Sequence, residues 1–103
     1  MRFHRKLYTG DSIRNPLKIK WKLKHCAGQL RIYVIALAGG DNQLEIYHCA
    51  FLQQKYYRKH PPYIVGIAGG YKEAVELLCR MIADIYRETG GYQMKEYFLR
   101  NER

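Results

Sequence analysis

Residues 17–24 read LKIKWKLK, and this strict alternation of apolar residues with lysines is the feature that most limits how the chain can fold. A period of two is typical of a β-strand, in which successive side chains point to opposite faces. We therefore predict a strand whose apolar face lies on a core. The other face would carry ammonium groups about 7 Å apart, in a positive stripe roughly 20 Å long. The residues of this stripe are Lys18, Lys20, Lys22 and Lys24.

Residues 30–38 follow a short glycine turn and are predicted to pair with the lysine strand as a hairpin. This pairing places Arg31 and Tyr33 on the lysine face. It also puts an apolar patch there, formed by Ile35 and Leu37, which is either covered by another part of the chain or exposed as a contact surface. The residues predicted to face the core are Leu30, Ile32, Val34 and Ala36.

Residues 43–52 form the next predicted strand, and its register depends on the length of the preceding loop. A three-residue loop with a bulge places Leu44 and Ile46 on the core face. Glu45 and Tyr47 then lie among the lysines, whereas a two- or four-residue loop reverses the assignment. We favour the first register, because it keeps the carboxylate of Glu45 out of the core, where an unpaired charge is costly.

Residues 53–62, QQKYYRKHPP, are predicted to form a long loop, since the proline pair blocks regular structure. Basic and aromatic side chains are interleaved in this segment. Such a pattern can hold phosphates with its charges and stack bases on its rings. The alternative interpretation is a solvated loop whose tyrosines cover the edge of the core. The candidate contact residues are Lys55, Tyr56, Tyr57, Arg58 and Lys59.

Residues 63–68 are a continuous apolar run that predicts a buried strand, and residues 71–89 carry apolar side chains at helical spacing before a Gly-Gly pair. Residues 92–100 predict a short last helix. We therefore predict one α+β domain over residues 17–103. It comprises a three- or four-stranded antiparallel meander, a long C-terminal helix on its apolar face and the short terminal helix. Residues 1–16 are predicted to be a basic arm, either solvated or following a phosphate backbone.

The formal net charge of +9 is concentrated in the first part of the chain. Residues 1–60 hold 12 Lys and Arg against 3 Asp and Glu, and residues 61–103 hold 6 of each. Concentrated positive charge favours polyanionic partners. The leading hypothesis is therefore a nucleic-acid-binding domain, DNA or RNA, with Tyr33, Tyr56 and Tyr57 stacking on bases or packing on sugars. Sequence specificity would be weak, because lysines on phosphates position a protein without reading bases.

Three other interpretations of the lysine face stay open. It can be the protected face of an edge strand, where lysines prevent aggregation between sheets. It can dock on an acidic protein surface, which would make the protein a small adaptor or inhibitor with Ile35 and Leu37 at the centre of the interface. The same apolar patch can form a homodimer through the sheet, with the lysines at its rim.

No pattern in the sequence indicates catalysis, a cofactor or a metal. His25-Cys26 and His48-Cys49 have residue types that bind zinc, but the predicted meander separates the two pairs by about 9–10 Å. Neighbouring His and Cys side chains on one strand point to opposite faces, so they cannot form a nucleophile and base pair. We therefore expect a binding protein without enzymatic activity.

Three cysteines without CxxC spacing indicate free thiols and a cytoplasmic location. The longest apolar run, residues 32–38, is too short to span a bilayer, so we expect no membrane association.

Overall fold

The computed structural model describes residues 2–24, 31–37, 43–60 and 62–100. At its centre lies a four-stranded sheet. Its strand order is β1-β4-β2-β3. β2 is antiparallel to β3 and β4, whereas β1 is parallel to β4, so the sheet is mixed. The strands are β1 (Arg2–Thr9), β2 (Tyr33–Leu37), β3 (Leu44–His48) and β4 (Tyr63–Ala68).

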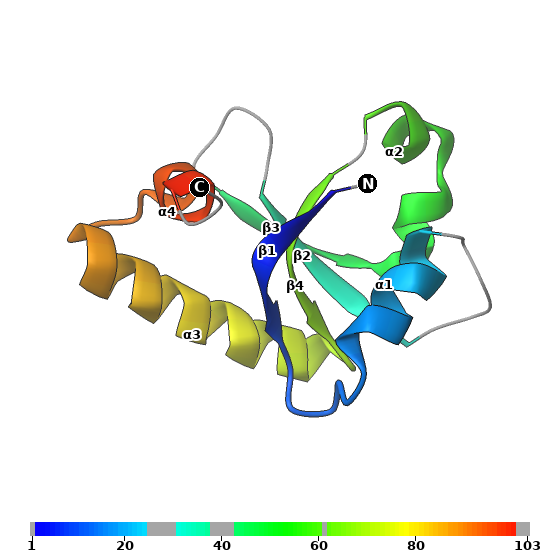
Figure 1. The fold of residues 1–103 in the computed structure, drawn as a ribbon, viewed down its shortest axis with the longest axis horizontal. Coiled ribbons are helices and arrows are strands. Elements are labelled where there is room, and N and C mark those ends of the chain that lie inside the picture. Colours follow the sequence, from blue (N-terminus) through cyan, green and yellow to red (C-terminus); the bar gives the residue numbers. More distant parts are fainter. Residues whose placement is uncertain (1, 25–30, 38–42, 61, 101–103) are drawn as a thin grey trace.

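Helices cover both faces of this sheet (Figure 1). On one face lie α3 and α4, and on the other lie α1, the 3-10 helix η1 and α2. The structure confirms the predicted α+β class, the long helix and the short last helix. The prediction of a purely antiparallel sheet is wrong, because β1 is parallel to β4. The helices are α1 (Pro16–Lys24), η1 (Cys49–Gln53), α2 (Lys55–Lys59), α3 (Tyr71–Thr89) and α4 (Met94–Arg100).

The largest correction concerns the lysine-rich segment, which is the helix α1 and not a strand. Asn15 begins the helix, because its side-chain oxygen accepts a hydrogen bond from the backbone N–H of Lys18 at 3.2 Å. Pro16 follows at the first helical position, where its fixed φ fits and its missing N–H costs nothing. Ile19 and Leu23 lie four residues apart and pack toward the sheet, and Leu23 is buried.

The N-terminal segment, predicted to be an arm, forms strand β1 at the edge of the sheet. Its register against β4 shifts between Phe3 and Tyr8, so β1 is irregular and its local sequence pattern is weak. The ring of Phe3 packs in the apolar cluster on the α1 side, whereas Tyr8 packs on the side of α3 and α4. β1 therefore owes its place to contacts with distant parts of the chain.

His4 is the buried polar residue that joins β1 to α4. Its Nε2 lies 2.9 Å from the carbonyl oxygen of Phe98, and its Nδ1 accepts a hydrogen bond from the backbone N–H of Lys6 at 3.1 Å. Because Nδ1 accepts, the hydrogen is on Nε2 and is donated to Phe98. The His4 and Phe98 rings also meet edge to face at 5.2 Å.

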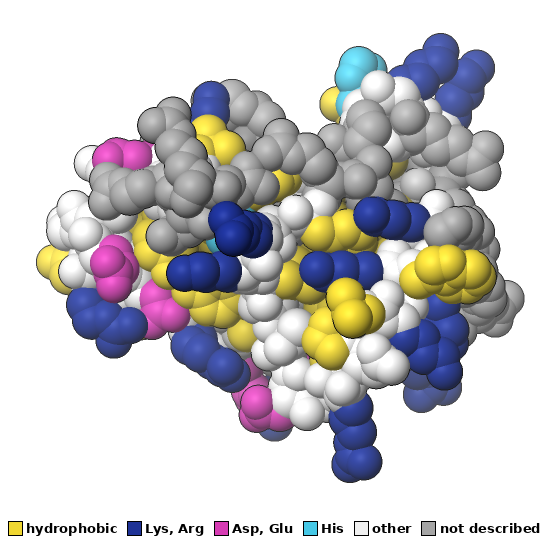
Figure 2. Space-filling model, viewed as in Figure 1, with side chains coloured by type: hydrophobic (Ala, Val, Ile, Leu, Met, Phe, Trp, Pro, Cys, Tyr) yellow, Lys and Arg dark blue, Asp and Glu magenta, His cyan; other side chains and the backbone are white. Residues whose placement is uncertain are grey.

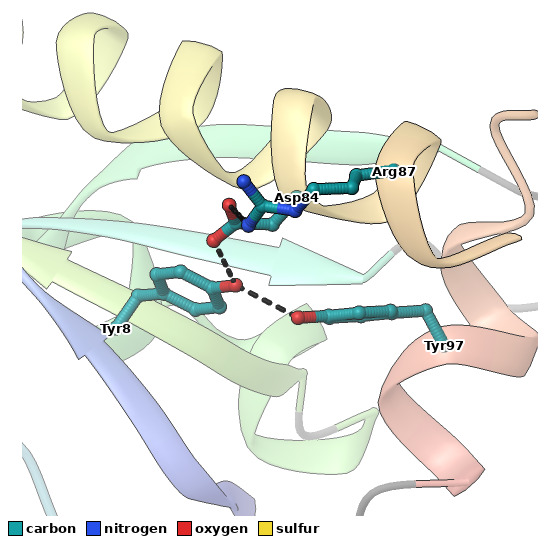
Figure 3. A network of polar contacts seen from close by, with 4 residues as sticks. All are labelled: Tyr8, Asp84, Arg87 and Tyr97. Atoms are coloured by element: carbon teal, nitrogen blue, oxygen red, sulfur yellow. Dashed lines mark hydrogen bonds and ion pairs between the residues drawn. The ribbon is translucent and has the colours of Figure 1, made fainter. Parts of the chain in front are cut away.

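A second polar contact joins β1, α3 and α4 (Figure 3). The hydroxyl of Tyr8 donates to Asp84 at 2.8 Å, and Tyr97 lies 2.9 Å from the same hydroxyl. Tyr8 has one hydroxyl hydrogen, so Tyr97 is the donor in the second bond. Arg87 holds the other oxygen of Asp84 at 2.6 Å. Burial, together with the hydrogen bonds to Tyr97 and Asp84, raises the pKa of Tyr8, so this hydroxyl stays protonated and acts as a structural tie.

The favoured register of β3 is wrong, because both faces of the sheet are covered. Ile46 pairs with Ile35, so Leu44 and Ile46 lie on the α3 face. Tyr47 pairs with Val34 on the opposite face, which the prediction made the core face. A pattern of alternating residues assigns one face to the core only when the other face is in water.

The glycine turn at residues 27–28 and the loop before β3 lie outside the described residues. The segment predicted to be a long loop, residues 53–62, is largely helical: η1 ends in it and α2 follows. α2 ends at Lys59 with His60 as its cap, so the proline pair that follows in the sequence did not prevent a helix before it. β4 and α3 have the predicted bounds, and Gly90 ends α3 with a left-handed φ of 76°.

Candidate nucleic-acid interface

The four lysines of α1 lie along two flanks of the helix instead of on one sheet face. Residues two positions apart are separated by about 200° around a helix, and residues four apart are neighbours. Lys18 and Lys22 therefore share one flank, and Lys20 and Lys24 share the other. The ammonium groups of Lys20 and Lys24 each lie 5.7 Å from the centre of the Phe3 ring, which is a cation–π distance. β1 thus helps to position the second flank.

Between these flanks, α1 exposes two large apolar side chains. Leu17 is 75% exposed and Trp21 is 56% exposed, and their spacing of four residues places them side by side. On a helix, this alternation places the apolar residues on two sides. Half of them pack on the sheet and the other half face solvent. Figure 2 shows Lys and Arg side chains mixed with hydrophobic ones over α1 and β1.

A hollow of about 310 Å³ lies beside the start of α1. Arg14, Lys18 and Arg31 line it from three different segments, and among the described lining residues they carry all of its formal charge. Ile19 and Ile32 are among its apolar lining residues. The structure therefore brings Arg31 to a lysine of α1, but this lysine is Lys18 at the start of the helix, whereas the predicted hairpin paired Arg31 with Lys24. Arg14 was missed, and the Asn-Pro pair that follows it is the sequence signal that would have placed it at a helix start.

Tyr33 does not join the lysines. It is half-buried on the α3 side of the sheet, where its ring lies 5.2 Å from His48 and 5.6 Å from Tyr71. The apolar patch predicted beside it also faces α3: Ile35 is fully buried and Leu37 packs against the same cluster. Of the two alternatives for this patch, coverage by another part of the chain is confirmed, so the patch is not available to a partner or to a second copy.

The basic and aromatic residues of α2 are largely on the surface. Lys55 and Lys59 are exposed, and Tyr56 is 63% exposed. Tyr57 is half-buried, because its ring packs at 5.4 Å on Tyr47 of the sheet. The side chain of Arg58 lies outside the described residues.

Four aromatic rings follow one another from the sheet to the surface of α2. The ring of Tyr57 contacts Tyr47 of β3 on one side and Tyr56 at 5.1 Å on the other. Tyr56 in turn lies 4.8 Å from His60. The exposed rings of Tyr56 and His60 are therefore supported by a partly buried pair.

α1 and α2 belong to the same layer of the molecule. Leu23 of α1 and Leu52 of η1 are buried in one apolar cluster, and Figure 1 shows α1, η1 and α2 on the same side of the sheet. We define the basic surface as the side chains that this layer and its hollow present to solvent. They are Arg14, Lys18, Lys20, Lys22, Lys24, Arg31, Lys55 and Lys59.

The Gly69-Gly70 turn before α3 holds a carboxylate of the chain itself. Glu73 accepts hydrogen bonds from the backbone N–H of Gly69, from the backbone N–H of Ser12 at 3.0 Å and from the hydroxyl of Ser12 at 2.7 Å. A side chain at Gly10 would meet this carboxylate, so the glycine permits the close approach. The turn is therefore a clasp between the β1–α1 loop and α3, and the N–H of Gly69 already has an anion as its partner.

The clasp predicts a pH dependence of stability. Burial alone would raise the pKa of Glu73, but hydrogen bonds from Gly69 and Ser12 outweigh it and lower the pKa below the ordinary value of 4.5. A carboxylate with a lowered folded pKa contributes stability that is complete above its unfolded pKa and is lost as the pH falls through the folded pKa. We expect Glu73→Gln to cost about 1 kcal/mol at neutral pH, since the group is partly in water.

Urea unfolding of wild type and Glu73→Gln at pH 7, and at steps from pH 5 to pH 3, measures this effect. The difference between the two proteins should shrink toward the acid end. Glu76→Gln, one turn further along α3 and exposed, is the control and should change little. A difference that stays constant with pH would show that the clasp does not depend on the charge of Glu73.

Within the described part of the chain, no three His, Cys, Asp or Glu residues are grouped to hold a metal ion. His25 and Cys26 lie outside it, whereas Cys49 is buried and Cys79 is exposed. None of the described helices combines the length and hydrophobicity needed to cross a bilayer. The cytoplasmic location and the lack of enzymatic activity stay predictions. Comparison with protein-family models, with curated proteins and with solved structures found no significant match to this chain.

Proposed function

We propose that this protein binds nucleic acid through the basic surface. The observation that carries the proposal is the meeting of Arg14, Lys18 and Arg31 around one hollow, next to a helix that contains four lysines and no acidic residue. Phosphate groups of a strand would lie in the hollow and along the flanks of α1. The N-terminal end of α1 opens on the same hollow and adds its partial positive charge.

The chemistry of this surface favours contacts to the backbone of the nucleic acid. Lysine ammonium groups are compact charges without a fixed bonding direction, whereas Arg14 and Arg31 can each hold a phosphate with two parallel hydrogen bonds. Contacts of both kinds position a protein on a strand and carry no sequence information. The proposed binding is therefore weakly sequence-specific and strongly dependent on salt.

Fluorescence-anisotropy titration of labelled oligonucleotides at several salt concentrations tests the proposal. In the double variant Lys18→Gln/Lys22→Gln, two phosphate contacts are lost. We expect the log-log salt slope to become shallower by about 1.4 on single strands or about 1.8 on duplex.

The double variant Arg80→Gln/Lys95→Gln removes the same charge from α3 and α4 and is the matched control. It should keep the slope of the wild type. If both double variants lose the same affinity and salt dependence, net charge and not the basic surface accounts for the binding. If the protein does not bind at the lowest salt concentration, the proposal is overturned.

A second candidate function is docking on an acidic protein surface, and the exposed pair of Leu17 and Trp21 favours it. Apolar side chains framed by cations are typical of protein interfaces, in which an apolar centre has a polar rim. A poly-glutamate peptide serves as the probe. If the peptide binds and oligonucleotides do not, and Leu17→Ala/Trp21→Ala weakens the binding, the second candidate replaces the first.

A further inference from the structure

The aromatic rings on α2 are not part of the basic surface, although they lie in the same layer of the molecule. The series leads from Tyr47 in the sheet through Tyr57 to Tyr56 and His60, with ring centres 4.8–5.4 Å apart. Tyr56 is 63% exposed and His60 is also exposed. The contact between Tyr57 and Tyr47 fixes the base of the series, so the outer rings are held in place before any ligand arrives.

Exposed lysines stand beside these rings. Lys55 and Lys59 lie on the same short helix, and the segment from Gln53 to His60 contains no acidic residue. Aromatic rings interleaved with cations are the arrangement that binds single strands, since the cations follow the phosphates and each ring receives a base. A ring that only covered the core would be buried, and Tyr56 is not.

We propose that the nucleic acid bound by this protein is single-stranded, and that an unpaired base stacks on Tyr56 beside His60. This inference rests on the proposed function and names its substrate class. The strand runs from the hollow at Arg14 and Arg31, along α1, to the rings of α2. Tyr57 is a positioning residue, because it supports Tyr56 from the sheet and is itself half-buried.

A duplex offers no free base face for stacking on Tyr56 or His60. In a duplex the faces of the bases are stacked on each other, so a protein ring reaches them only after a base has been turned out, which costs a few kcal/mol. The helix α2 has five residues, about 7.5 Å in length, and is too short to follow a groove. Stacking on an unpaired base needs one exposed ring and one nearby charge, and α2 supplies both.

Anisotropy titrations with three labelled probes of equal length test the inference: oligothymidylate, an abasic strand with the same sugar-phosphate backbone, and a duplex. We expect oligothymidylate to bind between about fivefold and about a hundredfold more tightly than the abasic strand for each stacked base. Tyr56→Ala should remove most of this advantage and leave the affinity for the abasic strand unchanged.

Tyr92→Ala is the matched control, because Tyr92 is 60% exposed and also contacts another ring, that of Tyr86, at 5.6 Å. It should bind all three probes as the wild type does. Equal binding of oligothymidylate and the abasic strand, equal effects of the two tyrosine variants, or a preference for the duplex would overturn the single-strand inference while nucleic-acid binding stands. Failure to bind any probe at low salt would overturn both.

Discussion

Replacing Phe98 with alanine is expected to lower the free energy of unfolding by about 3–5 kcal/mol, the usual cost of removing a buried aromatic ring. Phe98 is fully buried, and its ring contacts His4 at 5.2 Å, Tyr8 at 6.3 Å and Tyr97 at 5.1 Å. α4 has seven residues, too few to be stable alone, so this packing is what holds it against the sheet. The loss would be a large part of the 5–15 kcal/mol typical of a domain.

Urea unfolding followed by circular dichroism measures the effect of Phe98→Ala. The control is Leu99→Ala, because Leu99 is the next residue and is 39% exposed. It should change the stability by much less, about 0.5 kcal/mol. Similar losses in the two variants would mean that α4 is not held by the ring of Phe98.

Leu77→Ala is expected to cost about 2–5 kcal/mol, because it leaves a cavity between α3 and the sheet. Leu77 is buried in the main core cluster with Ile35 and Val65. A methyl carbon built on Gly66 of β4 would lie 3.5 Å from the Leu77 side chain, so the helix packs closely over the strand at this glycine. The surrounding backbone belongs to the central strands and has little freedom to close the cavity.

The same unfolding measurement on Cys79→Ala provides the comparison, since Cys79 lies two residues further along α3 and is exposed. Its replacement should stay within about 0.5 kcal/mol of the wild type. If Leu77→Ala were as mild as Cys79→Ala, the close packing of α3 on β4 would be wrong.

The sequence predicted the second half of the fold well because its signals there are local. The apolar run of β4 is bounded by glycines and prolines, and α3 has a sustained helical period that ends at Gly90. In α4, Met94 and Phe98 are buried and Tyr97 is half-buried, so the side of this helix that packs on the core follows its helical spacing. In these segments, propensity, pattern and tertiary packing favour the same structure.

The prediction of the first half of the fold failed where the local sequence pattern and the tertiary contacts favour different structures. The alternation of LKIKWKLK fits a strand, but Asn15 and Pro16 start a helix. In this helix only half of the apolar residues, Ile19 and Leu23, pack on the sheet. β1 could not be predicted from its own pattern, since its partner strand begins at Tyr63 and its register is irregular. Tertiary contacts of this range leave no period in the local sequence.

The basic character of the candidate site was predictable, and its geometry was not. Net charge belongs to composition, so Lys18, Arg31 and the α2 residues could be named before any fold was known. Their arrangement depends on whether α1 is a helix and on which sheet face it covers. Tyr33 was therefore assigned to the wrong face, and Arg14 belongs to the site because it lines the hollow beside α1, which no local pattern predicts.

The hydrogen bond between His4 and Phe98 joins residues 94 positions apart, and this has a consequence for the order in which the protein can form during synthesis. β1 is synthesised before the elements that it contacts. Its partner strand β4 ends at Ala68, and α4, which covers His4, begins at Met94. Before Ala68 is made, β1 lacks its partner strand, and before α4 is made, His4 lacks its cover. The domain therefore closes late, in a step that joins its earliest and its latest elements.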